Sequence, residues 1–144
     1  MVNDAPSITS TASTSAIEDE QYTYQVVVND PDDSGTDLSY NLSNEPSGMV
    51  VSTSGFITWT PGNGVTTSGQ VTLTVSDGGE DSAANAVQLF TVTVSEVNTG
   101  PSITSTAPTT GTEDVLYEYT LAVTDNDDAN NGTDLTFALT NAPE

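Results

Sequence analysis

Residues 18–30 read EDEQYTYQVVVND, and residues 113–125 read EDVLYEYTLAVTD. In both stretches a pair of acids leads into residues that alternate in polarity, beginning with Tyr22 and Tyr24 in the first copy. Alternation with a period of two is typical of a β-strand that buries one face. The chain therefore contains the same strand twice, each time behind the same acidic turn.

The similarity between the two halves of the chain extends beyond this strand. The block APSITST at residues 5–11 returns as GPSITST at 100–106, and GTDLSYNL at 35–42 returns as GTDLTFAL at 132–139. Matched blocks that follow one another in the same order indicate an internal repeat. We therefore expect a complete repeat, followed by a second copy of its first half.

The first repeat has the pattern of short strands throughout. Alternating apolar residues are separated by turn signals, such as STSG at residues 52–55. The last strand, at 86–97, is expected to carry a bulge near residues 89–90, because its alternation shifts there. Seven such strands at a spacing of about 8–12 residues are typical of an all-β Greek-key β-sandwich of the cadherin or Ig-like type.

These patterns divide the chain into two parts. We expect residues 1–97 to form one complete β-sandwich repeat. Residues 98–144 are expected to supply about three strands, which are the N-terminal half of a second repeat. Three strands are marginally stable alone, so we expect neighbouring repeats or other copies of the chain to cover the open half.

The composition excludes several classes of function. The 144 residues include 21 acids but no Lys, Arg, His or Cys, so the formal net charge is −21. Binding to nucleic acid requires cationic side chains, and catalysis by His, Lys or a thiol is equally impossible. No apolar run approaches 18 residues, so we expect no insertion into a membrane. We expect no enzyme, because the acids fall in loops between strands, where no cleft is indicated.

The same acids indicate a binding site for a hard cation. Seven alternating strands would bring their loops together at two ends of the sandwich, and close carboxylates repel one another unless a cation lies between them. Oxygen ligands from carboxylates and amides suit Ca²⁺. The predicted ligands are Asp4, Glu18, Asp19, Asp30, Asp32, Asp77, Asn98, Asp125 and Asp127.

The frame NDAPSITST, EDEQYTYQVVVNDPD, GTDLSYNLS, GMVVSTSGFITWTP and FTVTVSEVN resembles bacterial dystroglycan-type cadherin-like repeats, also described as Ig-like. Such repeats occur in tandem in large secreted adhesins. The resemblance covers nearly the whole chain and implies an extracellular β-sandwich module that Ca²⁺ stabilises. One departure is that the second linker has Thr99 where the first has Asp4.

The leading hypothesis is a non-catalytic, secreted structural module at the cell surface, in which Ca²⁺ stiffens a tandem array of an adhesin or an extracellular fibre. One alternative is a self-assembling filament subunit completed by a neighbouring chain. The other is a carbohydrate-binding module that uses Trp59 or the calcium loops to bind glycans. Trp59 is in phase with Ile57, however, which favours a buried core aromatic.

Overall fold

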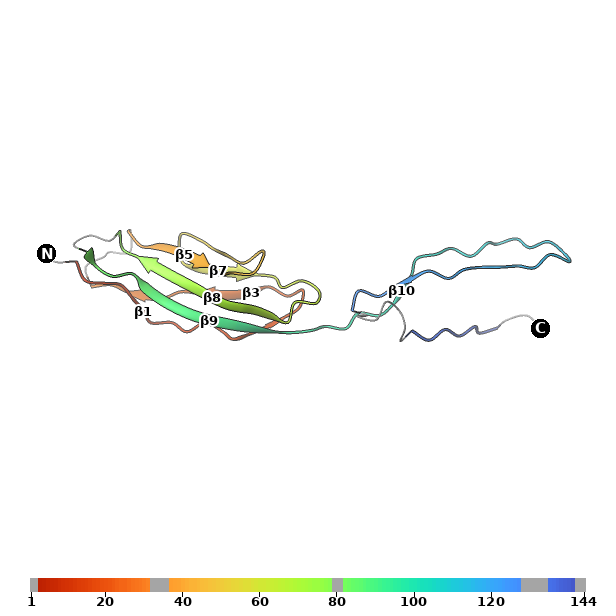
Figure 1. Ribbon diagram of the computed structural model, residues 1–144, viewed down its shortest axis with the longest axis horizontal. Coiled ribbons are helices and arrows are strands. Elements are labelled where there is room, and N and C mark those ends of the chain that lie inside the picture. The colour runs from red at the N-terminus through yellow and green to blue at the C-terminus, as the bar shows by residue number, and fades with distance from the viewer. Residues whose placement is uncertain (1–2, 32–36, 79–81, 128–134, 142–144) are drawn as a thin grey trace. The chain divides into compact units, whose positions relative to one another are not determined.

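The computed structural model describes residues 3–31, 37–78, 82–127 and 135–141 (Figure 1). The chain divides into two compact units, Met1–Val97 and Asn98–Glu144, which we call unit 1 and unit 2. Each unit is described by itself. In the described part of the chain, no helix has the length and apolar character that a membrane crossing requires.

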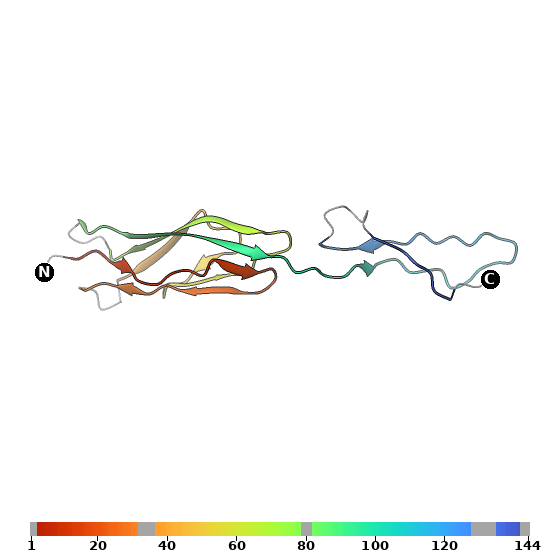
Figure 2. The ribbon, with the colours of Figure 1, turned by 90° about the horizontal axis from the view of Figure 1, so that it is seen from below.

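Unit 1 consists of strands in two main layers, which Figure 2 shows from below (Figure 2). One sheet has the order β2 (Ser15–Ile17), β9 (Ala86–Ser95), β8 (Thr67–Ser76), β5 (Ser39–Ser43). The second sheet has the order β3 (Tyr22–Gln25), β7 (Phe56–Trp59), β6 (Val50–Val51). A short antiparallel pair, β1 (Ser7–Ile8) with β4 (Val28–Asn29), extends the layer of β3. The prediction of an all-β, Ig-like sandwich is confirmed at this level.

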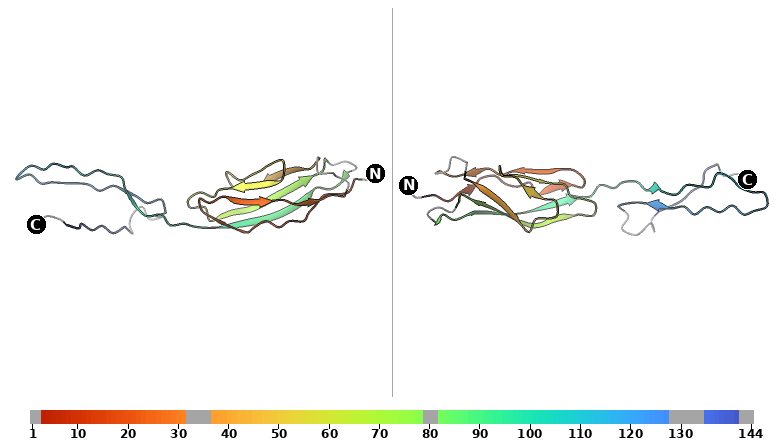
Figure 3. Two further views of the ribbon diagram at one scale, coloured as in Figure 1. Left: turned by 180° about the vertical axis from the view of Figure 1, so that it is seen from behind. Right: turned by 90° about the horizontal axis from the view of Figure 1, so that it is seen from above.

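The core lies between the two sheets, as the two views of Figure 3 allow the reader to follow (Figure 3). The first sheet contributes Val71, Leu73 and Val75 from β8, none of which is exposed to solvent. The second contributes Ile57 and Trp59 from β7. Alternate residues of each strand point inward, because successive side chains of a strand lie on opposite faces of its sheet. Removal of these apolar side chains from water is the main force that joins the layers.

The predicted bulge near residues 89–90 is wrong. Strand β9 alternates without interruption, because Gln88 points inward while Val87 and Leu89 are more than half exposed. The polarity of these three side chains is the reverse of the usual pattern, which made the alternation in the sequence look shifted. The irregularity lies instead in β8, where the register shifts between Thr67 and Gln70.

The irregular part of β8 is held by a buried side chain. The Oγ atom of Ser68 accepts a hydrogen bond from Val92 N at 2.8 Å and donates one to Gly69 O at 2.8 Å. Gly69 has a φ of +66°, which glycine adopts without strain. The side chain of Ser68 thus satisfies a backbone N–H of β9 where the ladder is interrupted.

Unit 2 contains two strands in its described part, β10 (Ser102–Ile103) and β11 (Val123–Thr124), which pair antiparallel. Their register repeats that of β1 with β4, since Ile103 lies opposite Val123 as Ile8 lies opposite Val28. The sequence repeat therefore corresponds to a repeat of backbone geometry.

Candidate functional site

The first candidate site surrounds Glu18, in the turn between β2 and β3. Only 3% of Glu18 is exposed, which is unusual for a charged residue. Its Oε1 atom accepts a hydrogen bond from Gly64 N at 2.9 Å, and its Oε2 atom accepts one from Val97 N at 3.0 Å. We call Glu18 with these two N–H groups the Glu18 clamp. Both carboxylate oxygens are satisfied by backbone donors.

The backbone of the same turn is fixed as firmly as the side chain. Glu18 N donates to Ser95 O at 3.0 Å, and Asp19 N donates to Pro61 O at 2.9 Å. Asp19 has a φ of +59°, a left-handed conformation in which Asp is one of the more tolerated residues. The turn, the loop after β7 and the end of β9 are therefore joined at one place. Val97, where unit 1 ends, is part of this junction.

The second candidate site lies at the opposite end of the strands and consists of Asn3, Asp4, Asp30 and Asp77. We call it the N-terminal cluster. Asn3 Nδ2 donates to Asp77 Oδ2 at 2.7 Å, and Asp77 is only 5% exposed. Asp30 follows directly after β4, whose Asn29 lies opposite Ser7, so Asp30 is close to the segment that carries Asp4. As predicted, the segment before β1 lies beside the loop after β8.

The electrostatics of the N-terminal cluster differ from those of the Glu18 clamp. Asp30 is partly buried, and its Oδ2 atom is inaccessible to solvent. The cluster offers oxygen ligands from three carboxylates and one amide, which is the ligand type that Ca²⁺ takes. The full-length chain contains no Lys or Arg that could neutralise them.

In unit 2, the corresponding acids have neutral partners. Asp127 Oδ2 accepts hydrogen bonds from both the backbone N and the Oγ1 of Thr99, and Asp125 Oδ1 accepts one from Asp127 N at 3.2 Å. Asn98 Nδ2 donates to the carbonyl of Thr99. Thr99 stands at the repeat position of Asp4, so a hydroxyl donor replaces a carboxylate at this place.

The predicted calcium ligands are therefore brought together only in part. Asp4, Asp30 and Asp77 share one end of unit 1, whereas Glu18 and Asp19 lie at the other end. Among the described residues, no three acids approach closely enough to hold a metal ion by themselves. Asp32 lies outside the described residues. The prediction of calcium sites at these positions stays a prediction.

A buried polar network crosses between the layers of unit 1. Tyr24 OH lies 2.7 Å from Ser10 Oγ and donates to Gln88 Oε1 at 2.9 Å, while Gln88 Nε2 donates to Ser10 O at 2.8 Å. Beside it, Tyr22 OH donates to Ser13 O at 2.9 Å. Burial raises the pKa of Tyr22 to about 12, with a further contribution from Tyr24.

Two of these arrangements escaped the sequence analysis. The donors to Glu18 are backbone N–H groups, which carry no residue signature. The inward position of Gln88 was hidden because a polar residue in a strand usually faces solvent. The burial of Trp59, which is 2% exposed, agrees with the core position favoured from the sequence and leaves no indole surface on which a sugar could stack.

Comparisons with known proteins identify a family for the larger part of the chain. Residues 5–95 match a family model described as "Putative Ig domain". Among solved structures, a putative α-galactosidase from Bacteroides fragilis is similar at a TM-score of 0.47 and 14% identity. The similarity covers 66% of this chain, which spans only 19% of that structure's chain. No curated protein matches the sequence closely enough to indicate a relative.

Proposed function

The chain belongs to the putative Ig domain family, and from this premise we propose that it is a non-catalytic structural module of an extracellular array. In this proposal the chain is part of a secreted cell-surface adhesin or fibre, where a tandem row of Ig-like sandwiches acts as a stiff spacer. We assign the strand segments of unit 1 to the seven-stranded Greek-key arrangement of such modules.

The observation that carries the proposal is that a buried carboxylate lies at each end of unit 1, beside the segment where the chain begins or leaves the sandwich. Asp77 holds Asn3 before β1, and Glu18 holds Val97 after β9. Hydrogen bonds to charged acceptors are about twice as strong as those between neutral groups. Linkers tied in this way have less freedom to bend than linkers that begin beyond the last contact.

We further propose that Ca²⁺ binds at the N-terminal cluster and stiffens that end of the module. Asp4, Asp30 and Asp77 would supply carboxylate oxygens, with the Asn3 side chain beside them. The bound ion would neutralise part of the charge that these groups concentrate in a partly buried place. The Glu18 clamp fits a metal less well, because backbone N–H groups already occupy both oxygens. Glu18 is therefore assigned the role of a hydrogen-bond acceptor.

Thermal unfolding with and without Ca²⁺ tests the ion. The melting temperature of the full chain is measured in millimolar CaCl₂ and in EDTA, with NaCl added to equal ionic strength, because a chain of charge −21 is stabilised by any salt. A ligand at 100 times its Kd stabilises the folded state by about 2.7 kcal/mol. We expect a rise of several degrees in Ca²⁺ that Asp30→Asn removes.

The matched control is Glu45→Gln, which removes the same charge from an exposed residue outside the cluster. This variant should keep the full response to Ca²⁺. Equal melting temperatures in Ca²⁺ and EDTA would refute the ion. An equal loss of response in both variants would show that Ca²⁺ acts only by screening.

A further inference from the structure

Unit 2 reproduces the internal hydrogen bonds of the first half of unit 1. Each contact joins residues at the same repeat positions and has nearly the same length. The pairs are Thr104 N to Ala122 O and Thr9 N to Val27 O (both 2.9 Å), Ala122 N to Ser105 Oγ and Val27 N to Ser10 Oγ (both 2.8 Å), and Ser105 Oγ to Tyr119 OH (2.6 Å) and Ser10 Oγ to Tyr24 OH (2.7 Å). The first half of the repeat thus has the same local geometry with or without the second half.

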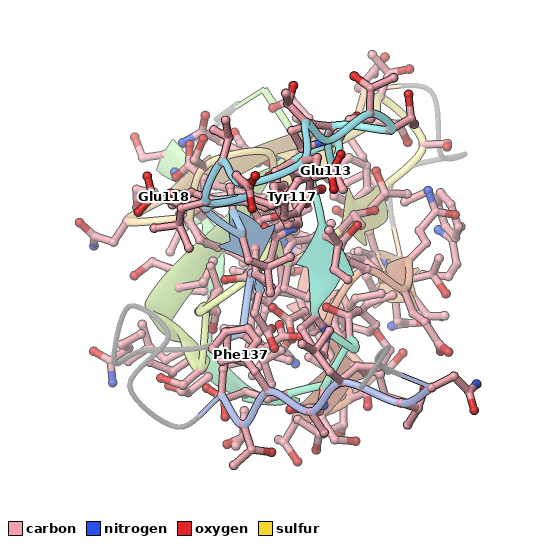
Figure 4. The ribbon with its side chains drawn as sticks, turned by 90° about the vertical axis from the view of Figure 1, so that its right-hand side faces the viewer. Glu113, Tyr117, Glu118 and Phe137 are labelled. Atoms are coloured by element: carbon pink, nitrogen blue, oxygen red, sulfur yellow. The ribbon has the colours of Figure 1, made fainter. Side chains whose placement is uncertain are left out.

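The apolar residues of this half are uncovered in unit 2. Tyr22 is 5% exposed in unit 1, whereas Tyr117, at the same repeat position, is 50% exposed. Phe137 and Leu139 are exposed by 63% and 90%. Figure 4 shows Tyr117 and Phe137 on separate segments of the unit (Figure 4). Exposed apolar surface of this extent marks an interaction site.

A groove of about 620 Å³ runs along this surface. Its walls are formed by Ile103, Tyr119, Leu121, Phe137 and Leu139. We call these residues with Tyr117 the open face. Most of them are at positions whose counterparts in unit 1 lie in the core or pack against it.

Unit 1 shows what covers this face. In unit 1 the covering strands are β7, β8 and β9, which all lie within residues 47–97. Tyr22 pairs with Trp59 of β7, and the ring of Tyr24 meets Phe90 of β9 edge-on, at a centroid distance of 6.1 Å. Residues 98–144 contain no counterpart of these three strands.

Polar groups of unit 2 are placed for the same partner. Glu18 accepts hydrogen bonds from Gly64 and Val97, which belong to the second half of the repeat, and its counterpart Glu113 is exposed. Tyr24 OH donates to Gln88, also from the second half, and its counterpart is the Tyr119 hydroxyl. A segment with this pattern would therefore meet matching acceptors as well as an apolar groove.

We propose that the open face of unit 2 binds a polypeptide segment with the sequence pattern of residues 47–97, which completes the second sandwich as β7, β8 and β9 complete the first. The occupant is recognised by alternating apolar strands and by an inward amide at the position of Gln88. The inference goes beyond the proposed spacer function and does not depend on calcium, so its test is run in EDTA.

The test adds a peptide of residues 47–97 to the full chain. The peptide carries its own Trp59, whose emission should shift to shorter wavelength when docking buries the indole, and size-exclusion chromatography with light scattering should show a 1:1 complex. Leu121→Asp, which places a charge in the groove, should weaken binding about tenfold or more. Thr120→Asp adds the same charge at the neighbouring exposed position and should leave binding unchanged.

Three results would overturn the proposal. The first is the absence of a complex and of any emission shift at peptide concentrations on the order of 100 μM. The second is binding that Leu121→Asp and Thr120→Asp affect equally, which would place the peptide elsewhere. The third is a dimer of the full chain alone that Leu121→Asp dissociates, since a second copy would then be the occupant of the open face.

Discussion

Replacement of Glu18 by Gln tests the Glu18 clamp with the smallest change of shape. The amide keeps one oxygen for a backbone N–H, but its NH₂ group faces the second N–H and cannot accept a hydrogen bond from it. A hydrogen bond to a charged group contributes about 1.5–3 kcal/mol, and an unsatisfied buried donor costs about 1–3 kcal/mol. We expect Glu18→Gln to destabilise unit 1 by about 2–3 kcal/mol.

A loss of that size is easily measured. For a domain of roughly this length, each kcal/mol lowers the melting temperature by about 4–8 °C, so the expected decrease is about 10–20 °C. Trp59 is the only tryptophan of the chain and is buried in unit 1, so its fluorescence follows the unfolding of unit 1 alone. Urea unfolding monitored in the same way gives the free energy of unfolding.

The control is Glu20→Gln in the same turn. Glu20 is exposed, and the substitution removes the same charge from a strongly acidic chain. We expect no loss of stability, and a slight gain is consistent with weaker charge repulsion. The reasoning is refuted when Glu18→Gln and Glu20→Gln melt within a degree or two of each other, because the buried carboxylate would then contribute nothing specific.

Two further predictions concern the core of unit 1. Gly55 has a φ of +73°, and a Cβ atom there would lie 2.7 Å from a ring carbon of Tyr40, so Gly55→Ala should cost about 1–3 kcal/mol in urea unfolding. Gly62→Ala, where a Cβ meets nothing within 4 Å, should be close to neutral, and equal effects would contradict the steric argument. The pKa of Tyr22 is raised to about 12, so its contribution to stability is complete below about pH 10 and is lost as the pH rises through 12. Tyr22→Phe should flatten the decline of the melting temperature between pH 10 and 12, and an unchanged decline would contradict this assignment.

The sequence was sufficient for the coarse architecture, because local patterns encode it. The alternation around Tyr22 and Tyr24, the turn at residues 52–55 and the in-phase pair Ile57 and Trp59 all predicted elements that the structure contains. Each of these signals depends on neighbours along one strand or on the chemistry of one turn. Features of that kind are determined by residues that are close together in the chain.

Features that depend on distant partners were harder to predict. Glu18 was predicted to bind a cation, but its observed partners are backbone groups 46 and 79 positions away. The irregularity in β9 was misplaced because Gln88 faces inward, toward a hydroxyl 64 positions before it. In both cases a polar side chain is buried because a particular partner satisfies it, and single-strand patterns contain no information about that partner.

The calcium proposal is tested most directly by measuring ion binding itself. Isothermal titration calorimetry of the full chain with CaCl₂, in buffer with enough NaCl to screen the surface charge, should show a saturable site with a Kd of about 10⁻⁴–10⁻³ M. Asp30→Asn should remove that site, whereas Glu45→Gln should retain it. Heat that never saturates, or that changes equally in both variants, would show that the N-terminal cluster is a solvated acidic surface and holds no ion.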